Sequence, residues 1–205
     1  MSQFARISCI TAALAVLLLG ACGGDDERCL GDTNLIAPLE TGVRWIYRTT
    51  LSDVSADTVI RVYFDTVQVL RDTMIDGETW SLVSWDEQAW INRSDGYWIW
   101  YEYAYPPSQP YHMAKFPASG GDTYVSDFAG IVHTVTVAGI EVRVTVPWGT
   151  IETYHYQFKD TDGVIDSEHY FVPGIGRIKS SYTLETHSGP QRRIFELMSF
   201  SMPGC

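Results

Sequence analysis

The stretch Ile140-Glu141-Val142-Arg143-Val144-Thr145-Val146 alternates strictly between an aliphatic residue and a charged or polar one. Successive side chains of a β-strand point to opposite faces, so this period predicts a strand with one buried face. A second run, Ile60 to Phe64, alternates in the same way, and the apolar positions then change phase to Val67 and Val69. That change predicts a bulge or bend near Asp65-Thr66. No stretch shows a sustained helical period with caps, so we expect a mostly β fold with little helix.

Turn signals separate the expected strands. Asp-Gly, a strong hairpin signal because both residues tolerate positive φ, occurs at Asp76-Gly77, Asp95-Gly96 and Asp162-Gly163. We also expect Ala138-Gly139 to turn Val132–Val137 into Ile140–Val146. Consecutive hairpins form an antiparallel meander, so residues 35–205 are predicted to be a single all-β domain. Its sheet should be strongly curved or closed into an incomplete barrel.

A weak internal repeat divides the chain into two halves. The segments Pro38–Trp45 and Pro117–Tyr124 share a proline, a glycine four positions later and an aromatic residue three positions after that. Each is predicted to be a turn that enters a strand whose aromatic residue anchors the core. A chance match is the alternative interpretation.

Residues 1–21 are typical of a secretory signal. The positive charge of Arg6 precedes the apolar run Ile10–Leu19, and Leu19-Gly20-Ala21-Cys22 follows. The apolar run is about half the length that a helix needs to cross a bilayer. We therefore expect the segment to be removed rather than to remain as a membrane span.

Leu19-Gly20-Ala21-Cys22 resembles the lipobox of bacterial lipoproteins. The resemblance implies cleavage before Cys22, lipid (palmitate and related acyl chains) on its thiol and a cell-envelope location held by the anchor. Residues 22–34, with acidic Asp25-Asp26-Glu27, are predicted to be a flexible tether. Because residue 23 is glycine rather than aspartate, the common sorting rule implies the outer membrane if the cell is Gram-negative.

Removal of residues 1–21 leaves 13 basic against 25 acidic residues. Such an acidic surface repels phosphate backbones, which argues against a nucleic-acid partner. Once Cys9 leaves with the signal and Cys22 takes lipid, only Cys29 and Cys205 remain. In an oxidising compartment we expect these two to form a disulfide, with free thiols or bonds to partners as the alternative.

The densest aromatic region extends from Trp80 to Tyr105, and both faces of a strand beginning at Tyr97 would carry aromatic side chains. One face can pack in the core, while the other must cover a second layer, line a cavity or contact a ligand. The candidate ligand-binding residues are therefore Trp98, Trp100, Tyr101 and Tyr103. Ordinary aromatic packing within strands is the alternative.

Neither a metal site nor a catalytic motif is predicted. His155 should face Glu168 or His169 across a hairpin, but no third ligand is evident and an ion pair explains the pattern better. The chain has no nucleophile elbow, no phosphate-binding glycine loop and no two-histidine metal helix. Carboxylates such as Asp86 and Glu102 could form a glycosidase pair, although nothing fixes their separation. We expect no cofactor, and the absence of motifs favours binding over catalysis.

Three segments resemble a set of uncharacterised exported bacterial proteins: Pro38-Leu39 with Gly42 and Trp45, Val146–Glu152 with Pro147 and Gly149-Thr150, and Tyr170–Lys179 with Pro173-Gly174-Ile175-Gly176. More distantly, the chain is similar to the LolA/LolB-like lipoprotein-carrier fold, which implies a curved antiparallel half-barrel around an apolar cavity.

The function that we predict is a lipid-anchored, non-catalytic binding module for an apolar molecule, a glycan or an envelope protein. A hydrolase acting on envelope polysaccharide or lipid is one alternative, and a structural surface protein is another.

Overall fold

The computed structural model describes residues 30–204 except 87, 102–108 and 129. The described residues form twelve strands: β1 (Arg44–Asp53), β2 (Thr58–Ile75), β3 (Glu78–Val83), β4 (Gln88–Arg93), β5 (Gly96–Tyr101), β6 (Tyr111–Lys115), β7 (Thr123–Phe128), β8 (Ile131–Val146), β9 (Gly149–Lys159), β10 (Ile165–Val172), β11 (Gly176–Thr186) and β12 (Gly189–Ser201). They contain no helix, and hence no helix that could cross a membrane. The predicted all-β antiparallel architecture is confirmed.

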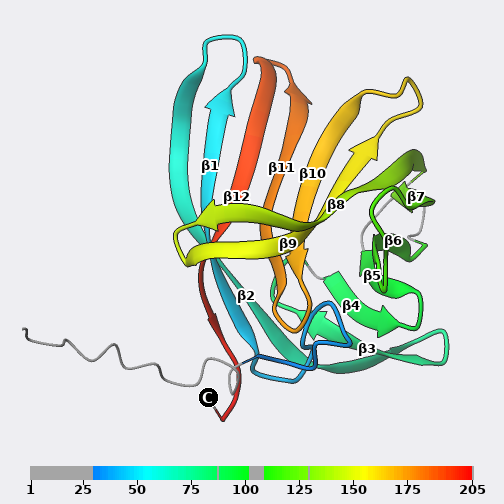
Figure 1. The fold of residues 1–205 in the computed structure, drawn as a ribbon. Coiled ribbons are helices and arrows are strands. Elements are labelled where there is room, and N and C mark those ends of the chain that lie inside the picture. Colours follow the sequence, from blue (N-terminus) through cyan, green and yellow to red (C-terminus); the bar gives the residue numbers. More distant parts are fainter. Residues whose placement is uncertain (1–29, 87, 102–108, 129, 205) are drawn as a thin grey trace, which may run out of the picture.

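The twelve strands form one sheet, in the order β6-β5-β4-β3-β2-β1-β12-β11-β10-β9-β8-β7. Two meanders, β1 to β6 and β7 to β12, therefore join side by side where β1 pairs with β12. Strong twist and curvature bring the two outer strands, β6 and β7, towards each other, and the sheet becomes a nearly closed barrel with one unsealed seam (Figure 1).

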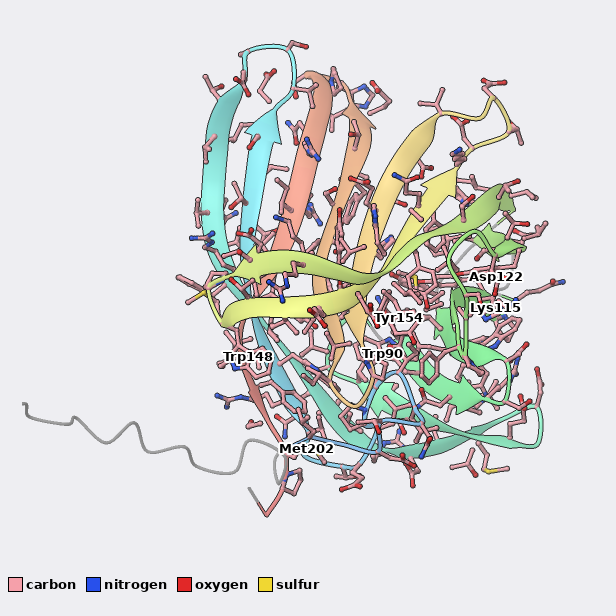
Figure 2. All side chains as sticks on the ribbon, viewed as in Figure 1. Trp90, Lys115, Asp122, Trp148, Tyr154 and Met202 are labelled. Atoms are coloured by element: carbon pink, nitrogen blue, oxygen red, sulfur yellow. The ribbon has the colours of Figure 1, made fainter. Side chains whose placement is uncertain are left out.

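Side chains bridge this seam where no backbone ladder forms between the described residues. The Tyr124 hydroxyl donates to the Met113 carbonyl at 3.0 Å, and the Tyr156 hydroxyl donates to the Lys115 carbonyl at 2.7 Å. The ammonium of Lys115 lies 2.8 Å from the carboxylate of Asp122, and Figure 2 shows the two side by side. Edge carbonyls that a neighbouring strand would otherwise satisfy are thus paired with tyrosine hydroxyls.

The turn before β1 and the turn before β7 share one backbone conformation and hydrogen-bond pattern, as the weak sequence repeat predicted. Gly42 and Gly121 both adopt positive φ, at 95° and 88°. Each donates its backbone N–H to a valine carbonyl of the second strand that follows, Gly42 to Val69 of β2 at 2.9 Å and Gly121 to Val137 of β8 at 2.8 Å. The turns therefore start β1 and β7 in the same way, and the aromatic residue of the first, Trp45, is buried in the core.

Asp-Gly turns produce hairpins where they were expected. Asp76-Gly77 connects β2 to β3 with φ of 51° and 84°. Asp162-Gly163 lies in the connection between β9 and β10. At the third site, the two-residue turn is Ser94-Asp95, and Gly96 is already the first residue of β5.

The prediction of a turn at Ala138-Gly139 is wrong, because β8 continues through these residues without reversing its direction. Between Val137 and Val142 five steps along β8 match three steps along β9, so the extra residues form a bulge. Glu141 adopts φ of 59° there and absorbs the local bend. Beyond the bulge the predicted alternation holds, because Val144 and Val146 are buried while the residues between them are exposed.

Of the bulge or bend predicted near Asp65-Thr66, the bulge is absent. The register between β1 and β2 is continuous from Arg44↔Gln68 to Leu51↔Arg61, and it shifts only beyond Leu51. The strand keeps its phase, so the odd-numbered Val67 and Val69 point to the core. The even-numbered residues of the other face stay in water: Ile60, Val62 and Phe64 are 50%, 51% and 65% exposed.

The segment before β1 closes one end of the barrel. Ile36 and Ala37 are 1% and 2% exposed, and Asn92 of β4 donates to the Ala37 carbonyl at 2.7 Å. Gly31 donates its backbone N–H to the Gly174 carbonyl at 2.8 Å, so ordered contacts already occur within residues 30–34. The end of β12 and Met202, which follows it, lie at this same end of the barrel (Figures 1 and 2).

The β10–β11 turn fixes this closed end to β1. The indole N–H of Trp45 donates to the Ile175 carbonyl at 2.6 Å, and both residues are buried. Gly174 and Gly176 adopt φ of 79° and 100°, which explains the two glycines of the Pro-Gly-Ile-Gly segment. The opposite end of the barrel carries the β1–β2, β9–β10 and β11–β12 turns (Figure 1).

Candidate functional site

A cavity of about 400 Å³ lies within the curved sheet. Strands of both halves contribute to its wall. Its apolar and aromatic lining residues are Trp85, Ile99, Tyr101, Tyr111, Met113, Phe128, Ile131, Phe158, Tyr182 and Leu184. A largely apolar pocket of this size with a few polar groups is typical of a site for a small ligand.

Two arginines line this apolar cavity, Arg177 of β11 and Arg193 of β12. A register shift between β10 and β11 at Tyr170/Phe171 directs Arg177 inward, since Arg177 there pairs with buried Phe171. The next residue, Ile178, is fully buried, whereas Arg177 is partly buried and lines the cavity, so two successive side chains point inward. Re-aiming a side chain in this way is a common effect of a β-bulge.

Aromatic rings surround the Arg177 guanidinium. Its Cζ lies 4.4 Å from the ring centre of Trp85, 5.5 Å from Tyr47 and 5.6 Å from Phe195. The Nε and Nη2 atoms are buried and have no hydrogen-bond partner within the described part of the chain. No described carboxylate forms a salt bridge with Arg177. The cavity therefore contains a cation that aromatic rings stabilise and that has no anionic partner among the residues the structure describes.

The two acidic residues of the cavity wall are positioned differently. Asp86 is exposed, and Asp166 accepts a hydrogen bond from His133 Nε2 at 2.7 Å, with its side chain 35% exposed. The carboxylates thus lie where water reaches them, whereas two nitrogens of Arg177 are withdrawn from it.

His169 also lines the cavity and is buried next to these groups. Burial, the nearby Arg177 charge, His133 and His155 together hold the pKa of His169 well below 6.5. Its imidazole is therefore neutral at neutral pH. Its Nδ1 has no hydrogen-bond partner among the described residues.

Tyrosine hydroxyls supply neutral hydrogen-bonding groups to one wall. Tyr101 and Tyr111 stack with ring centres 6.0 Å apart, and Gln88 Nε2 donates to the Tyr101 hydroxyl at 2.6 Å. Burial raises the pKa of Tyr101 and raises that of Tyr111 well above 10. Both hydroxyls therefore stay protonated and can donate to a ligand.

The four candidate binding residues occupy different places. Tyr101 lines the cavity. Trp98 and Trp100 do not belong to its wall. The Trp98 ring stacks on His112 at 4.4 Å, and the Arg93 guanidinium lies 4.8 Å from its centre. Tyr103 lies outside the described residues, as do Glu102, Cys22, Cys29 and Cys205.

The side chains of His155 and Glu168 meet, with Nε2 to Oε1 at 3.0 Å, but the register places His155 opposite Tyr170 rather than opposite Glu168 or His169. His169 points to the other face of β10 and lines the cavity. Within the described ranges, no group of three histidine, cysteine, aspartate or glutamate residues is arranged to hold a metal ion. No described serine or threonine hydroxyl is hydrogen-bonded to a histidine ring, so these residues form no serine–histidine pair of the hydrolase type.

Arg177, His133 and Asp166 were not predicted from the sequence as residues of the site. Arg177 carries a local signal, because the Pro-Gly-Ile-Gly segment ends beside it and a glycine within a strand pattern often marks a bulge. His133 and Asp166 are 33 residues apart and meet only through the pairing of β8, β9 and β10, so no local pattern connects them.

No family model and no curated protein matches the chain. Three solved structures are similar to it in outline. A protein assigned as a lipoprotein in Parabacteroides distasonis aligns with 83% of this chain and 100% of its own, at 9% identity and a TM-score of 0.43. An exported protein with a YmcC-like fold from Bacteroides fragilis aligns with 82% of this chain and 100% of its own, at 8% identity and a TM-score of 0.48.

The third is a LolA superfamily protein from Nitrosomonas europaea. It aligns with 83% of this chain and 90% of its own, at 11% identity and a TM-score of 0.32. These identities and TM-scores assign the chain neither to a family nor to an activity. The function must be argued from the cavity itself.

Proposed function

We propose that this chain is a lipid-anchored protein of the cell envelope that binds an apolar molecule inside its barrel and catalyses no reaction. The observation that carries the proposal is the aromatic-lined cavity of about 400 Å³. An apolar ligand gains free energy there by leaving water, at about 25 cal/mol for each Å² that it buries. The tyrosine hydroxyls and Gln88 at the wall can orient a polar end of the ligand.

The place where the described chain begins is compatible with an anchor on Cys22. Leu30 begins the described chain beside the β10–β11 turn, at the end that the segment Leu30–Leu39 closes. A lipid on Cys22 would hold that closed end towards the membrane. The opposite end would then face away from the membrane and remain accessible to a ligand or to a partner that delivers one.

Hydrolysis of polysaccharide or lipid is less well supported than binding. The described cavity wall has one His–Asp pair, and its Ser167 hydroxyl donates to Asp166 at 3.1 Å rather than to the histidine. A nucleophile needs contact with its base, and this arrangement does not supply that contact.

Native mass spectrometry of the full chain, purified from its own envelope in a mild detergent, tests the proposal. We expect a one-to-one adduct with the mass of an apolar metabolite or lipid. Ser167→Trp places a large ring in the cavity wall and should remove the adduct, while Ser188→Trp at the exposed β11–β12 turn should retain it. A bare wild-type mass, or an adduct that survives in both variants, would contradict the proposal.

A further inference from the structure

We infer that the ligand is an amphiphile with a single carboxylate, which Arg177 binds while the apolar body fills the rest of the cavity. This inference rests on the proposed function and specifies the chemical class of the ligand. It specifies the charged group of the ligand, which the apolar lining of the cavity does not determine.

First, Arg177 carries a positive charge that no described side chain of the cavity neutralises. Among the described residues, four charged side chains line the cavity: Asp86, Asp166, Arg177 and Arg193. Both carboxylates are reached by water, and Asp166 is already bonded to His133. Arg177 has two buried nitrogens without a partner among the described residues. Arg177 is partly buried, and holding two of its nitrogens away from water without an anion costs free energy that a ligand anion would reduce.

The second step is the environment of the guanidinium. Trp85, Tyr47 and Phe195 surround it with ring faces and edges, which hold the cation in place without neutralising it. A guanidinium presents paired N–H donors in a planar fork that matches a carboxylate. The ligand would find this fork already oriented, so little side-chain entropy is lost when it binds.

The third step distinguishes a carboxylate from a phosphate. A phosphate monoester carries a charge of about −1.5 to −2 at neutral pH. Opposite one guanidinium in an apolar wall, it would leave part of that charge buried and unpaired. Arg193 also lines the cavity, and its Nε is likewise buried without a partner among the described residues, but its Nη1 donates to the Tyr182 hydroxyl at 3.2 Å. Arg177 is therefore the cavity arginine whose guanidinium makes no hydrogen bond within the described residues, and one carboxylate matches its charge.

The test compares headgroups on one alkyl chain. The full chain in non-ionic detergent is mixed with equal amounts of dodecanoate, dodecanol and dodecyl phosphate at mildly alkaline pH, and bound masses are counted by native mass spectrometry. We expect dodecanoate to be retained over dodecanol by roughly tenfold or more, the effect of one charge-assisted hydrogen bond. Dodecyl phosphate should not exceed dodecanoate.

Variants assign the preference to the guanidinium. Arg177→Met keeps an unbranched apolar stem and should bind dodecanol as the wild type does, without the preference for dodecanoate. Arg177→Lys should keep part of the preference, because the charge remains but the planar fork is lost. Arg143→Gln removes an exposed arginine that pairs with Glu152 and should leave the preference unchanged.

The outcomes separate the inference from the proposed function. If wild type retains dodecanol and dodecanoate equally, or if Arg177→Met keeps the preference, the carboxylate inference is overturned and apolar binding stands. Stronger retention of dodecyl phosphate overturns the choice of headgroup. If none of the three amphiphiles is retained, the proposed function fails together with the inference.

Discussion

The guanidinium carbon of Arg177 lies 4.4 Å from the ring centre of Trp85, inside a cavity whose other walls are mostly apolar. The two residues come from different halves of the barrel, Trp85 from the β3–β4 connection and Arg177 from β11. Their contact connects the meanders across the cavity. It also keeps a positive charge at a place where no side chain of the described residues forms a salt bridge with it.

Replacement of Gly174 by alanine should destabilise the closed end of the barrel. A Cβ atom would lie 2.8 Å from the Gly31 carbonyl oxygen, and φ is 79°. Gly163→Ala is the matched control, since φ is 80° there and nothing lies within 4 Å. Backbone strain of roughly 1 kcal/mol applies to both variants.

Urea unfolding of each variant measures the difference. Gly174→Ala should lower the free energy of unfolding by about 2 kcal/mol more than Gly163→Ala, because it also disturbs the bond from the Gly31 N–H. Equal losses would show that the contact between the N-terminal segment and the β10–β11 turn contributes nothing to stability.

Tyr156→Phe should loosen the seam. The hydroxyl donates to the Lys115 carbonyl at 2.7 Å, and its removal leaves an edge carbonyl of β6 unpaired, at a cost of about 1–2 kcal/mol. Hydrogen exchange of the β6 amides should accelerate. Tyr170→Phe, which removes a hydroxyl from the β10 ring stacked on His155, should leave that exchange unchanged. Unaltered β6 protection in Tyr156→Phe would show that the seam does not depend on this bond.

Stability should fall as the pH is lowered from 7 to 5. Burial keeps the pKa of His169 well below 6.5, and the nearby Arg177 charge, His133 and His155 reinforce this. The unfolded chain takes up a proton near 6.5, whereas the folded protein resists it, so proton uptake favours unfolding. The contribution of His169 is fully present above 6.5 and is lost progressively below that value.

Urea unfolding at pH 7 and pH 5 checks this prediction. His169→Phe removes the titrating group and should reduce the loss between the two pH values. Part of the loss should remain, because burial also lowers the pKa of His112. His187→Asn, in the exposed β11–β12 turn, should keep the wild-type loss. An unchanged pH dependence in His169→Phe would refute the assignment.

Lipid on Cys22 is predicted to hold the chain on the membrane, and labelling with palmitate tests this. Cells that express the wild-type chain with labelled palmitate should yield a labelled, membrane-bound protein that lacks residues 1–21. Cys22→Ser should abolish the label and release the chain from the membrane fraction. Label that persists in Cys22→Ser would place the lipid elsewhere or show that another signal holds the chain.

Reducing and non-reducing peptide maps of the same sample would test the predicted disulfide bond between Cys29 and Cys205.

Periodicity and turn chemistry were sufficient to predict the fold class. Alternation at Ile140–Val146 and the Asp-Gly pairs are local signals, and a meander follows from them without any long-range information. The local pattern did not predict which face is buried where both faces of a strand carry apolar residues. At β2, Ile60, Val62 and Phe64 have the period of a core face but lie outside.

The cavity could not be predicted in the same way. Its wall depends on the curvature of twelve strands and on a register shift between β10 and β11, neither of which follows from local sequence. Of the candidate binding residues, Tyr101 reaches the cavity because β5 alternates, with Ile99 and Tyr101 on the inner face. The same alternation places Trp98 beside His112.

Photo-crosslinking measures most directly whether the barrel cavity is the binding site. The full chain would be irradiated with a long-chain alcohol that carries a diazirine, and the labelled peptides would be sequenced by mass spectrometry. Our account predicts label on cavity-wall residues such as Phe128, Phe158 and Tyr182, and its loss in Ser167→Trp. Label confined to the exposed apolar face of β2, at Ile60, Val62 and Phe64, would contradict it.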